Sequence, residues 1–203
     1  KEIAQSNYDS IKAQAKAFGR NPNEVKVYPI LAPIIGETEN EVESRFEEIK
    51  SLANIDEALD YLGRYYDHHD FSQYDLDAPF PELGEVGQNS FRATADAIAA
   101  RAKEHQLTLR EVALEETVRR SPFMGTYEKV ADLIIEWFED GAADGFIFGP
   151  HIYGAVYDEF INHVLPILEQ KGYYTQEYQG DTLRDHIGIP FKENRYSQSH
   201  VTQ

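Results

Sequence analysis

The stretch GTYEKVADLIIEWFEDGAADGFIFGP, residues 125–150, decides the fold, because it contains the pattern of one complete helix followed by one strand. Thr126 suits the helix N-cap, since its hydroxyl oxygen can accept a hydrogen bond from a backbone N–H of the first turn. Five apolar residues then share one face at helical spacing: Val130, Leu133, Ile134, Trp137 and Phe138. Gly141 suits the left-handed residue that ends many helices, and the apolar run 146–148 predicts a buried parallel strand before Pro150.

Two more strands are predicted upstream of this unit. Residues 25–35 (VKVYPILAPII) are mostly apolar and β-forming. Proline has no N–H to donate to a ladder, so Pro29 and Pro33 limit the regular strand to Val25–Ile30. Residues 121–124 form a short third strand.

Helices are predicted around these strands. Thr38 with Glu41 and Thr108 with Glu111 have the capping-box pattern that begins a helix. Pro166 predicts a kink or a late start in the last helix, because proline disrupts a helix interior. The expected helices lie over 1–19, from Thr38, from Asn54 or Asp56, over 90–105, from Thr108 and over 157–170.

The remaining segments lack a regular pattern. Residues 67–89 are rich in Asp, Pro, Gly and aromatic residues, and a loop this long is usually a lid, a binding loop or disordered. Residues 172–203 are expected to form an irregular tail. Strands separated by helices imply a parallel α/β sheet with right-handed crossovers. Three strands would leave both sheet edges open, which fits part of a β/α barrel better than a closed domain.

Composition excludes several classes of partner. The 203-residue chain is 41% hydrophobic and has a formal net charge of −17, so phosphate backbones and anionic lipid surfaces would be repelled. No apolar run approaches the roughly 18 residues that span a membrane. The absence of cysteine excludes disulfides and Cys-based zinc sites and makes the cytoplasm the expected compartment. The start at Lys1 has neither an initiator Met nor a signal-peptide core, so we expect the chain to begin inside a longer protein.

Three groups of residues could carry chemistry. His68 and His69 form either a solvated polar loop or a metal site, although adjacent side chains point in different directions. His151, Tyr153 and Tyr157 follow a predicted strand. At that end of a barrel strand they would line a pocket mouth, and otherwise they belong to a buried or surface loop without a ligand. Arg119 and Arg120 either meet an anionic group or form salt bridges with the Glu-rich helices.

Residues 125–150 resemble the C-terminal half of the bacterial-luciferase-like, FMN-dependent monooxygenases. The branch is that of the nitrilotriacetate, long-chain alkane and dibenzothiophene-sulfone monooxygenases. The resemblance is carried by Gly125-Thr126, by Trp137-Phe138-Glu139 and by GAADGF at residues 141–146, and it continues in FINHVLPIL (160–168) and in YQGDTL (178–183) with the following RDHIG.

The resemblance implies the last three strand–helix units, approximately, of a (β/α)8 TIM barrel. A helical and loop insertion would occupy about residues 67–118, and a C-terminal tail about 172–203. The enzyme would insert one oxygen atom from O2 into a small organic substrate, with reduced FMN supplied by a partner flavin reductase. The missing N-terminal barrel half and a homo-oligomer would be its further partners.

The flavin contacts of the family lie mostly upstream of Lys1, so we assign no catalytic, cofactor or metal residue, and this chain alone is expected to be inactive. Substrate contacts are predicted for Phe148, His151, Tyr153 and Arg120. Arg120 stands where some relatives have a substrate-side histidine, and that difference leaves the substrate class open. Aromatic residues near the strand ends suit an apolar or aromatic compound, or simply the core.

Two alternatives remain at the level of sequence. One is a non-catalytic fragment that is stable only as an oligomer or beside its N-terminal half. The other is an unrelated acidic α/β binding module without flavin.

Overall fold

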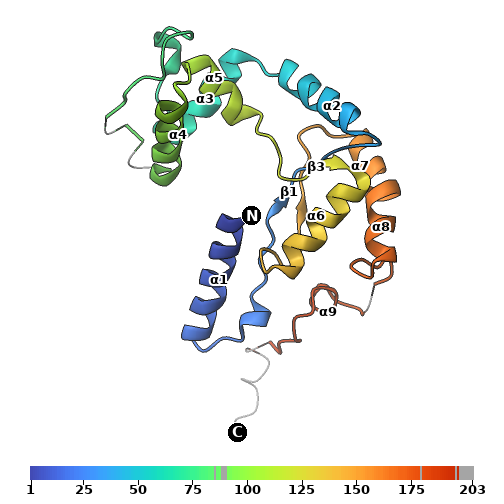
Figure 1. Ribbon diagram of the computed structural model, residues 1–203. Helices are drawn as coiled ribbons and strands as arrows, with labels where there is room; N and C mark the ends of the chain where they lie inside the picture. The colour runs from blue at the N-terminus through green and yellow to red at the C-terminus, as the bar shows by residue number, and fades with distance from the viewer. Residues whose placement is uncertain (85, 88–90, 179, 195, 197–203) are drawn as a thin grey trace. The chain divides into compact units, whose positions relative to one another are not determined.

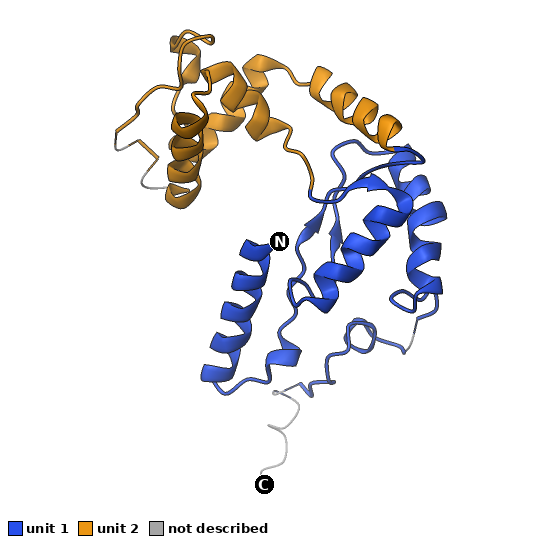
Figure 2. Ribbon diagram, in the orientation of Figure 1, with its two compact units in different colours: residues 1–38, 122–203 blue, residues 39–121 orange. Residues whose placement is uncertain are grey.

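The computed structural model describes residues 1–84, 86–87, 91–178, 180–194 and 196. These residues form two compact units, coloured separately in Figure 2. Unit 1 comprises residues 1–38 and 122–203, and unit 2 comprises residues 39–121. Small parts of the predicted insertion (85 and 88–90) and of the predicted tail (179, 195 and 197–203) lie outside the described residues.

Unit 1 is built on one extended segment that pairs with two others. Strand β1 (Ile30–Leu31) pairs in parallel with β4 (Ile147–Phe148), and β2 (Ile34–Gly36) pairs in parallel with β3 (Met124–Thr126). Figure 1 labels β1 and β3 of these pairs, together with the helices of unit 1. The parallel α/β arrangement predicted from the sequence is therefore present, and no closed barrel occurs among the described residues.

The prolines displace the first strand from its predicted place. Regular pairing begins at Ile30 rather than spanning Val25–Ile30, and it breaks between Leu31 and Ile34, where Pro33 lies. Pro29 still takes part, because its carbonyl accepts a hydrogen bond from the Ile147 N–H at 3.0 Å. The reason is that proline can accept in a parallel ladder but cannot donate. The third predicted strand, at 121–124, is found at Met124–Thr126.

Helix α6 (Tyr127–Glu139) covers the strands as the sequence predicted. The Thr126 side chain accepts a hydrogen bond from the Lys129 N–H at 3.4 Å, and Gly141 has the expected left-handed φ of 69°. The prediction is wrong for one residue of the apolar face, because Phe138 is 49% exposed. The buried positions on α6 follow a slightly different face: Val130, Ala131, Ile134 and Trp137.

The helix predicted over 157–170 is continuous but changes type. It consists of α7 (Ala155–Glu159), a π-helical turn at Phe160–Val164 and α8 (Leu165–Gln170). Pro166 has no N–H for a bond to the preceding turn, and a wider π turn just before it accommodates that loss. Phe160, Val164 and Leu168 from this segment join the core of unit 1. The tail predicted to be irregular contains one short helix, α9 (Leu183–His186), which the Thr182–Asp185 capping box begins.

The carboxylate of Asp144 ties the first helix to the strands. Its Oδ2 accepts hydrogen bonds from the Val27 N–H and from Lys12 Nζ, both at 2.8 Å. Its Oδ1 accepts a hydrogen bond from the Tyr8 hydroxyl at 3.1 Å. Lys12 also donates to the Val25 carbonyl at 2.7 Å, so α1 (Glu2–Ala17) is joined to the segment that enters β1.

Unit 2 is helical and has its own core. Its helices are α2 (Glu39–Ser51), α3 (Ile55–Gly63), α4 (Arg92–His105) and α5 (Leu109–Thr117). Short 3-10 turns lie at Arg64–Tyr66 and Phe71–Gln73 in unit 2, and at Pro22–Glu24 in unit 1. Of the two predicted caps for α3, the structure selects Asn54, and the capping box at Thr108 and Glu111 is confirmed.

The long irregular segment of unit 2 is held by backbone hydrogen bonds. Its Phe80 N–H donates to the Leu107 carbonyl at 3.0 Å, and its Ala78 carbonyl accepts from the Leu109 N–H at 3.1 Å. Pro79 forms an isolated antiparallel bridge with Thr108. The start of α5 therefore anchors this segment.

We expect Asp144→Asn to destabilise unit 1 by about 2–3 kcal/mol, because it removes one partner of a mostly buried ion pair. The side chains of Asp144 and Lys12 are each only 14% exposed. Urea unfolding followed by the fluorescence of Trp137, the single tryptophan, which is buried in the core of unit 1, would measure the loss. The matched control is Asp132→Asn, whose 61% exposed carboxylate pairs with Lys171 and should contribute less than about 0.5 kcal/mol. Equal effects of the two substitutions would contradict the assignment.

Unit 2 should lose stability as the pH rises from 10 to about 12. Burial, followed by the hydrogen bond with Tyr61, raises the pKa of Tyr65 from 10.0 to about 12. Burial also raises the pKa of Tyr66, whose hydroxyl donates to the Ala95 carbonyl. The unfolded chain releases these protons first, so stability present below pH 10 is lost above it. Circular dichroism during urea unfolding should show a smaller alkaline loss in the Tyr65→Phe/Tyr66→Phe variant than in the parent chain.

Candidate functional site

The predicted histidine pair takes part in packing within unit 2. His69 Nε2 lies 3.0 Å from the Tyr74 hydroxyl oxygen, and its ring meets Phe71 edge-on at 5.1 Å. Asp67 and His68 have left-handed backbone angles, with φ of 56° and 60°. In the described part of the chain, no three His, Asp or Glu side chains are grouped so that they could hold a metal ion.

The end of β4 presents a row of aromatic side chains. The Phe148 ring lies 4.6 Å from Phe160 and 4.9 Å from Tyr157, measured between centroids. Tyr157 in turn stacks on Tyr153, at 6.0 Å and 19°. The row runs from the buried Phe160 to Tyr153, which is 75% exposed. It therefore forms an aromatic wall that continues the core of unit 1 to the surface.

His151 lies in the loop between β4 and α7. Its side chain is exposed, yet neighbouring protein removes part of its hydration and lowers the pKa of the imidazole below its ordinary value of 6.5. The neutral form, which can donate one hydrogen bond and accept another, is therefore favoured at neutral pH.

Arg119 and Arg120 both form the salt bridges predicted as one of their two roles. Arg120 pairs with Glu43, and its guanidinium lies 4.5 Å above the Phe46 ring. Arg119 pairs with Glu116. Of the four predicted substrate residues, Phe148, His151 and Tyr153 belong to unit 1 and Arg120 belongs to unit 2.

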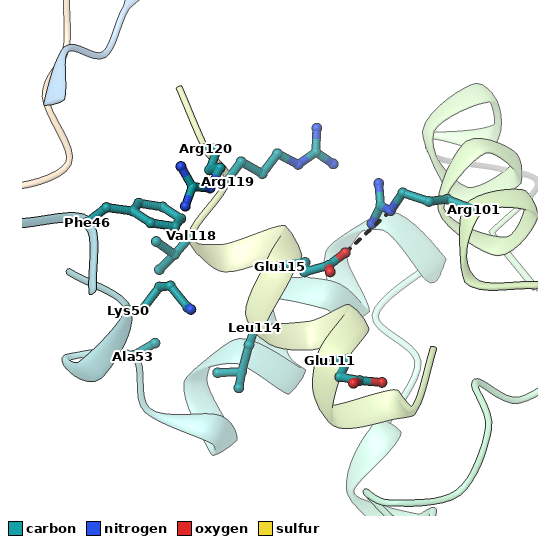
Figure 3. A pocket seen from close by; sticks show the side chains of 10 residues that line it. All are labelled: Phe46, Lys50, Ala53, Arg101, Glu111, Leu114, Glu115, Val118, Arg119 and Arg120. Atoms are coloured by element: carbon teal, nitrogen blue, oxygen red, sulfur yellow. Dashed lines mark ion pairs between the residues drawn. The ribbon is translucent and has the colours of Figure 1, made fainter. Parts of the chain in front are cut away.

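Arg120 borders a pocket of about 600 Å³ within unit 2. Figure 3 shows its side chains, which come from α2 and the residues after it, from α5 and the residues after it, and from Arg101 of α4. The lining residues are Phe46, Lys50, Ala53, Arg101, Glu111, Leu114, Glu115, Val118, Arg119 and Arg120. Sequence reasoning found only the arginine pair, because the other residues come together through the packing of separate helices.

Glu116 organises the arginines beside this pocket. Its side chain is fully buried and pairs with both Arg101 and Arg119. The neighbouring Glu115 is 52% exposed and lies 3.5 Å from Arg101 Nε. A buried carboxylate between two guanidinium groups restricts where those groups can lie, since leaving it without a partner would be costly.

Comparisons with known proteins give a consistent set of relatives, although no protein-family model matches the chain. The chain is 34% identical to the N-acetyl-S-(2-succino)cysteine monooxygenase of Bacillus subtilis over 199 residues, which are 97% of this chain and 45% of that protein. It is 35% identical to the dibenzothiophene-sulfone monooxygenase of Rhodococcus erythropolis over 192 residues, 93% of this chain and 42% of that protein. The chain thus spans less than half the length of these relatives.

Solved structures agree with the sequence relatives. A riboflavin lyase, crystallised with modified FMN and its substrate riboflavin, matches with a TM-score of 0.71 and 29% identity over 93% of this chain and 41% of that one. DmoA of Hyphomicrobium sulfonivorans matches with a TM-score of 0.73 and 25% identity over 92% of this chain and 39% of that one. None of the helices in the described ranges is long and apolar enough to cross a membrane.

We expect Glu116→Gln to destabilise unit 2 by about 3 kcal/mol, because it removes the charge from a buried site between two arginines. Glu115→Gln is the matched control on the next residue, and its exposed pair should contribute less than about 1 kcal/mol. Urea unfolding followed by circular dichroism would measure both. A similar stability for the two variants would show that Glu116 does not organise the arginines.

Proposed function

We propose that this chain, which is homologous over nearly its whole length to part of the luciferase-like, FMN-dependent monooxygenases, contributes barrel strands and a substrate wall to such an enzyme. The carrying observation is the 34% identity to a monooxygenase over 97% of the chain. The relatives confirm the resemblance inferred from residues 125–150. The whole enzyme would use reduced FMN from a partner reductase and insert one oxygen atom of O2 into a small organic substrate.

The exposed strand face supports the proposal that these are about the last three units of a barrel. Ile30 and Ile147 are register partners in β1 and β4 and are 67% and 57% exposed. Their neighbour Leu31 is 3% exposed and belongs to the core of unit 1. Alternate residues of barrel strands face the barrel interior, so the two isoleucines would pack against strands supplied by the remaining part of the enzyme.

The described residues fit one wall of a flavin or substrate pocket and do not enclose a cofactor. Ile152 and Tyr153, which follow β4, are 43% and 75% exposed. FMN would therefore be held by residues of the remaining enzyme. We place Phe148, His151 and Tyr153 on the substrate side, where the aromatic rings would contact an apolar part of the substrate and the imidazole would hydrogen-bond to it.

The test uses the complete enzyme that contains residues 1–203. Quenching of flavin fluorescence should reveal FMN binding by the complete enzyme and much weaker binding by this chain alone. Tyr153→Ala and His151→Ala should raise the substrate KM about tenfold, the effect of losing roughly 1.4 kcal/mol of binding, and should leave FMN affinity unchanged.

The matched control is Tyr178→Ala, which removes another exposed tyrosine of unit 1, 85% exposed and placed after α8. It should alter neither measurement. A complete enzyme that binds no FMN would refute the proposed activity. Unchanged KM values in the His151 and Tyr153 variants would refute only the assignment of the substrate wall.

A further inference from the structure

The pocket of unit 2 combines an apolar wall with a cationic rim. We propose that it binds a small amphipathic organic anion, a carboxylate or sulfonate that carries an aromatic or branched apolar body. This site is formed by residues of unit 2 alone, and its test requires no flavin.

The size and the apolar wall suit a compact organic ligand. The pocket has a volume of about 600 Å³, which lies within the range of small-molecule sites. The wall is formed by Phe46, Ala53, Leu114 and Val118. The Phe46 ring already attracts cations on its face, with Arg120 at 4.5 Å and Lys50 Nζ at 5.6 Å. A ligand with an apolar body beside Phe46 would therefore place its anionic group near these cations.

The concentration of positive charge is unusual for this protein. Four of the ten lining residues are Lys or Arg, whereas the whole chain has 19 among 203 residues and a net charge of −17. The four side chains, Lys50, Arg101, Arg119 and Arg120, are between 34% and 56% exposed. They are thus accessible to a ligand, and their charge would favour an anion over a neutral compound.

Glu116 holds the two arginine side chains in position, and not all of their N–H donors are used. Arg119 uses Nη2 for Glu116, and a guanidinium has five N–H donors, so the fork retains donors for a ligand oxygen. Arg101 is more fully engaged, because it pairs with Glu116 through Nη2 and its buried Nε lies 3.5 Å from the Glu115 carboxylate.

The acidic neighbours favour a single negative charge on the ligand. Glu111 and Glu115 line the pocket, and Glu116 lies buried beside it. Glu43 and Glu47 pair with Arg120 and Lys50, so five carboxylates surround the four cations. A nucleotide or a polyphosphate would meet stronger repulsion from these carboxylates than a monoanion would, because the repulsion grows with the charge of the ligand.

The test titrates the full chain with two fluorescent probes that differ in charge. Anilinonaphthalene sulfonate is a monoanion with an aromatic body, and phenylnaphthylamine is its neutral counterpart. We expect saturable binding of the sulfonate and at least about tenfold weaker binding of the neutral amine, since only the sulfonate oxygens can accept charge-assisted hydrogen bonds from the cations. Lys50→Gln and Arg119→Gln should each weaken sulfonate binding severalfold, and Lys171→Gln, which removes an exposed cation of unit 1, should not.

A third variant, Ala53→Phe, distinguishes a loss of binding from a loss of folding. Arg119→Gln leaves the buried Glu116 with one partner and is accepted only if circular dichroism matches the parent chain. Ala53→Phe keeps every charge but fills the pocket, and it should abolish sulfonate binding without altering the spectrum. Equal binding of the two probes, or unchanged sulfonate affinity in both Lys50→Gln and Ala53→Phe, would overturn the proposal.

Discussion

The architecture of unit 1 depends on the contacts of Asp144, placed between α6 and β4. Its carboxylate joins the Val27 N–H, Lys12 and Tyr8, while its own N–H donates to the Val27 carbonyl at 2.9 Å. One residue thus continues the parallel pairing of β1 with β4 and also attaches α1. At the next position, a Cβ on Gly145 would lie 2.3 Å from the Tyr28 ring, so this close approach requires glycine. The Asp-Gly pair within the GAADGF motif therefore has a structural explanation.

Sequence patterns predicted well what neighbouring residues determine. The capping box at Thr108 was recognised because both partners lie within one turn. The same pattern at Thr182 and Asp185 begins α9, but it precedes too few apolar residues to stand out from an irregular tail. The position of β1 was missed because the carbonyl of Pro29 can still accept a ladder bond, a distinction that composition does not reveal.

Contacts between distant residues escaped prediction for a different reason. Arg101 and Glu116 lie on separate helices, and only the packing of α4 and α5 within unit 2 brings them together. Glu116 has a local partner in Arg119, three residues further on, but no spacing in the sequence relates it to Arg101, so the sequence offers no sign of that pairing. Phe148 and Tyr157 also come into contact through packing, although their position at or beyond the end of a predicted strand did identify the region.

The buried Glu116 is better explained by positioning than by stability. Removing the Glu116 carboxylate from water costs several kcal/mol, and an apolar residue of similar volume often stabilises a protein equally well. An apolar replacement, however, would leave Arg101 and Arg119 free to extend into solvent or to pair with other acidic residues of this strongly acidic chain. With Glu116 in place, both guanidinium groups are held beside the pocket before any ligand arrives. Such preorganisation reduces the entropy lost on binding, which gives the ion triad a role in recognition that its contribution to folding would not explain.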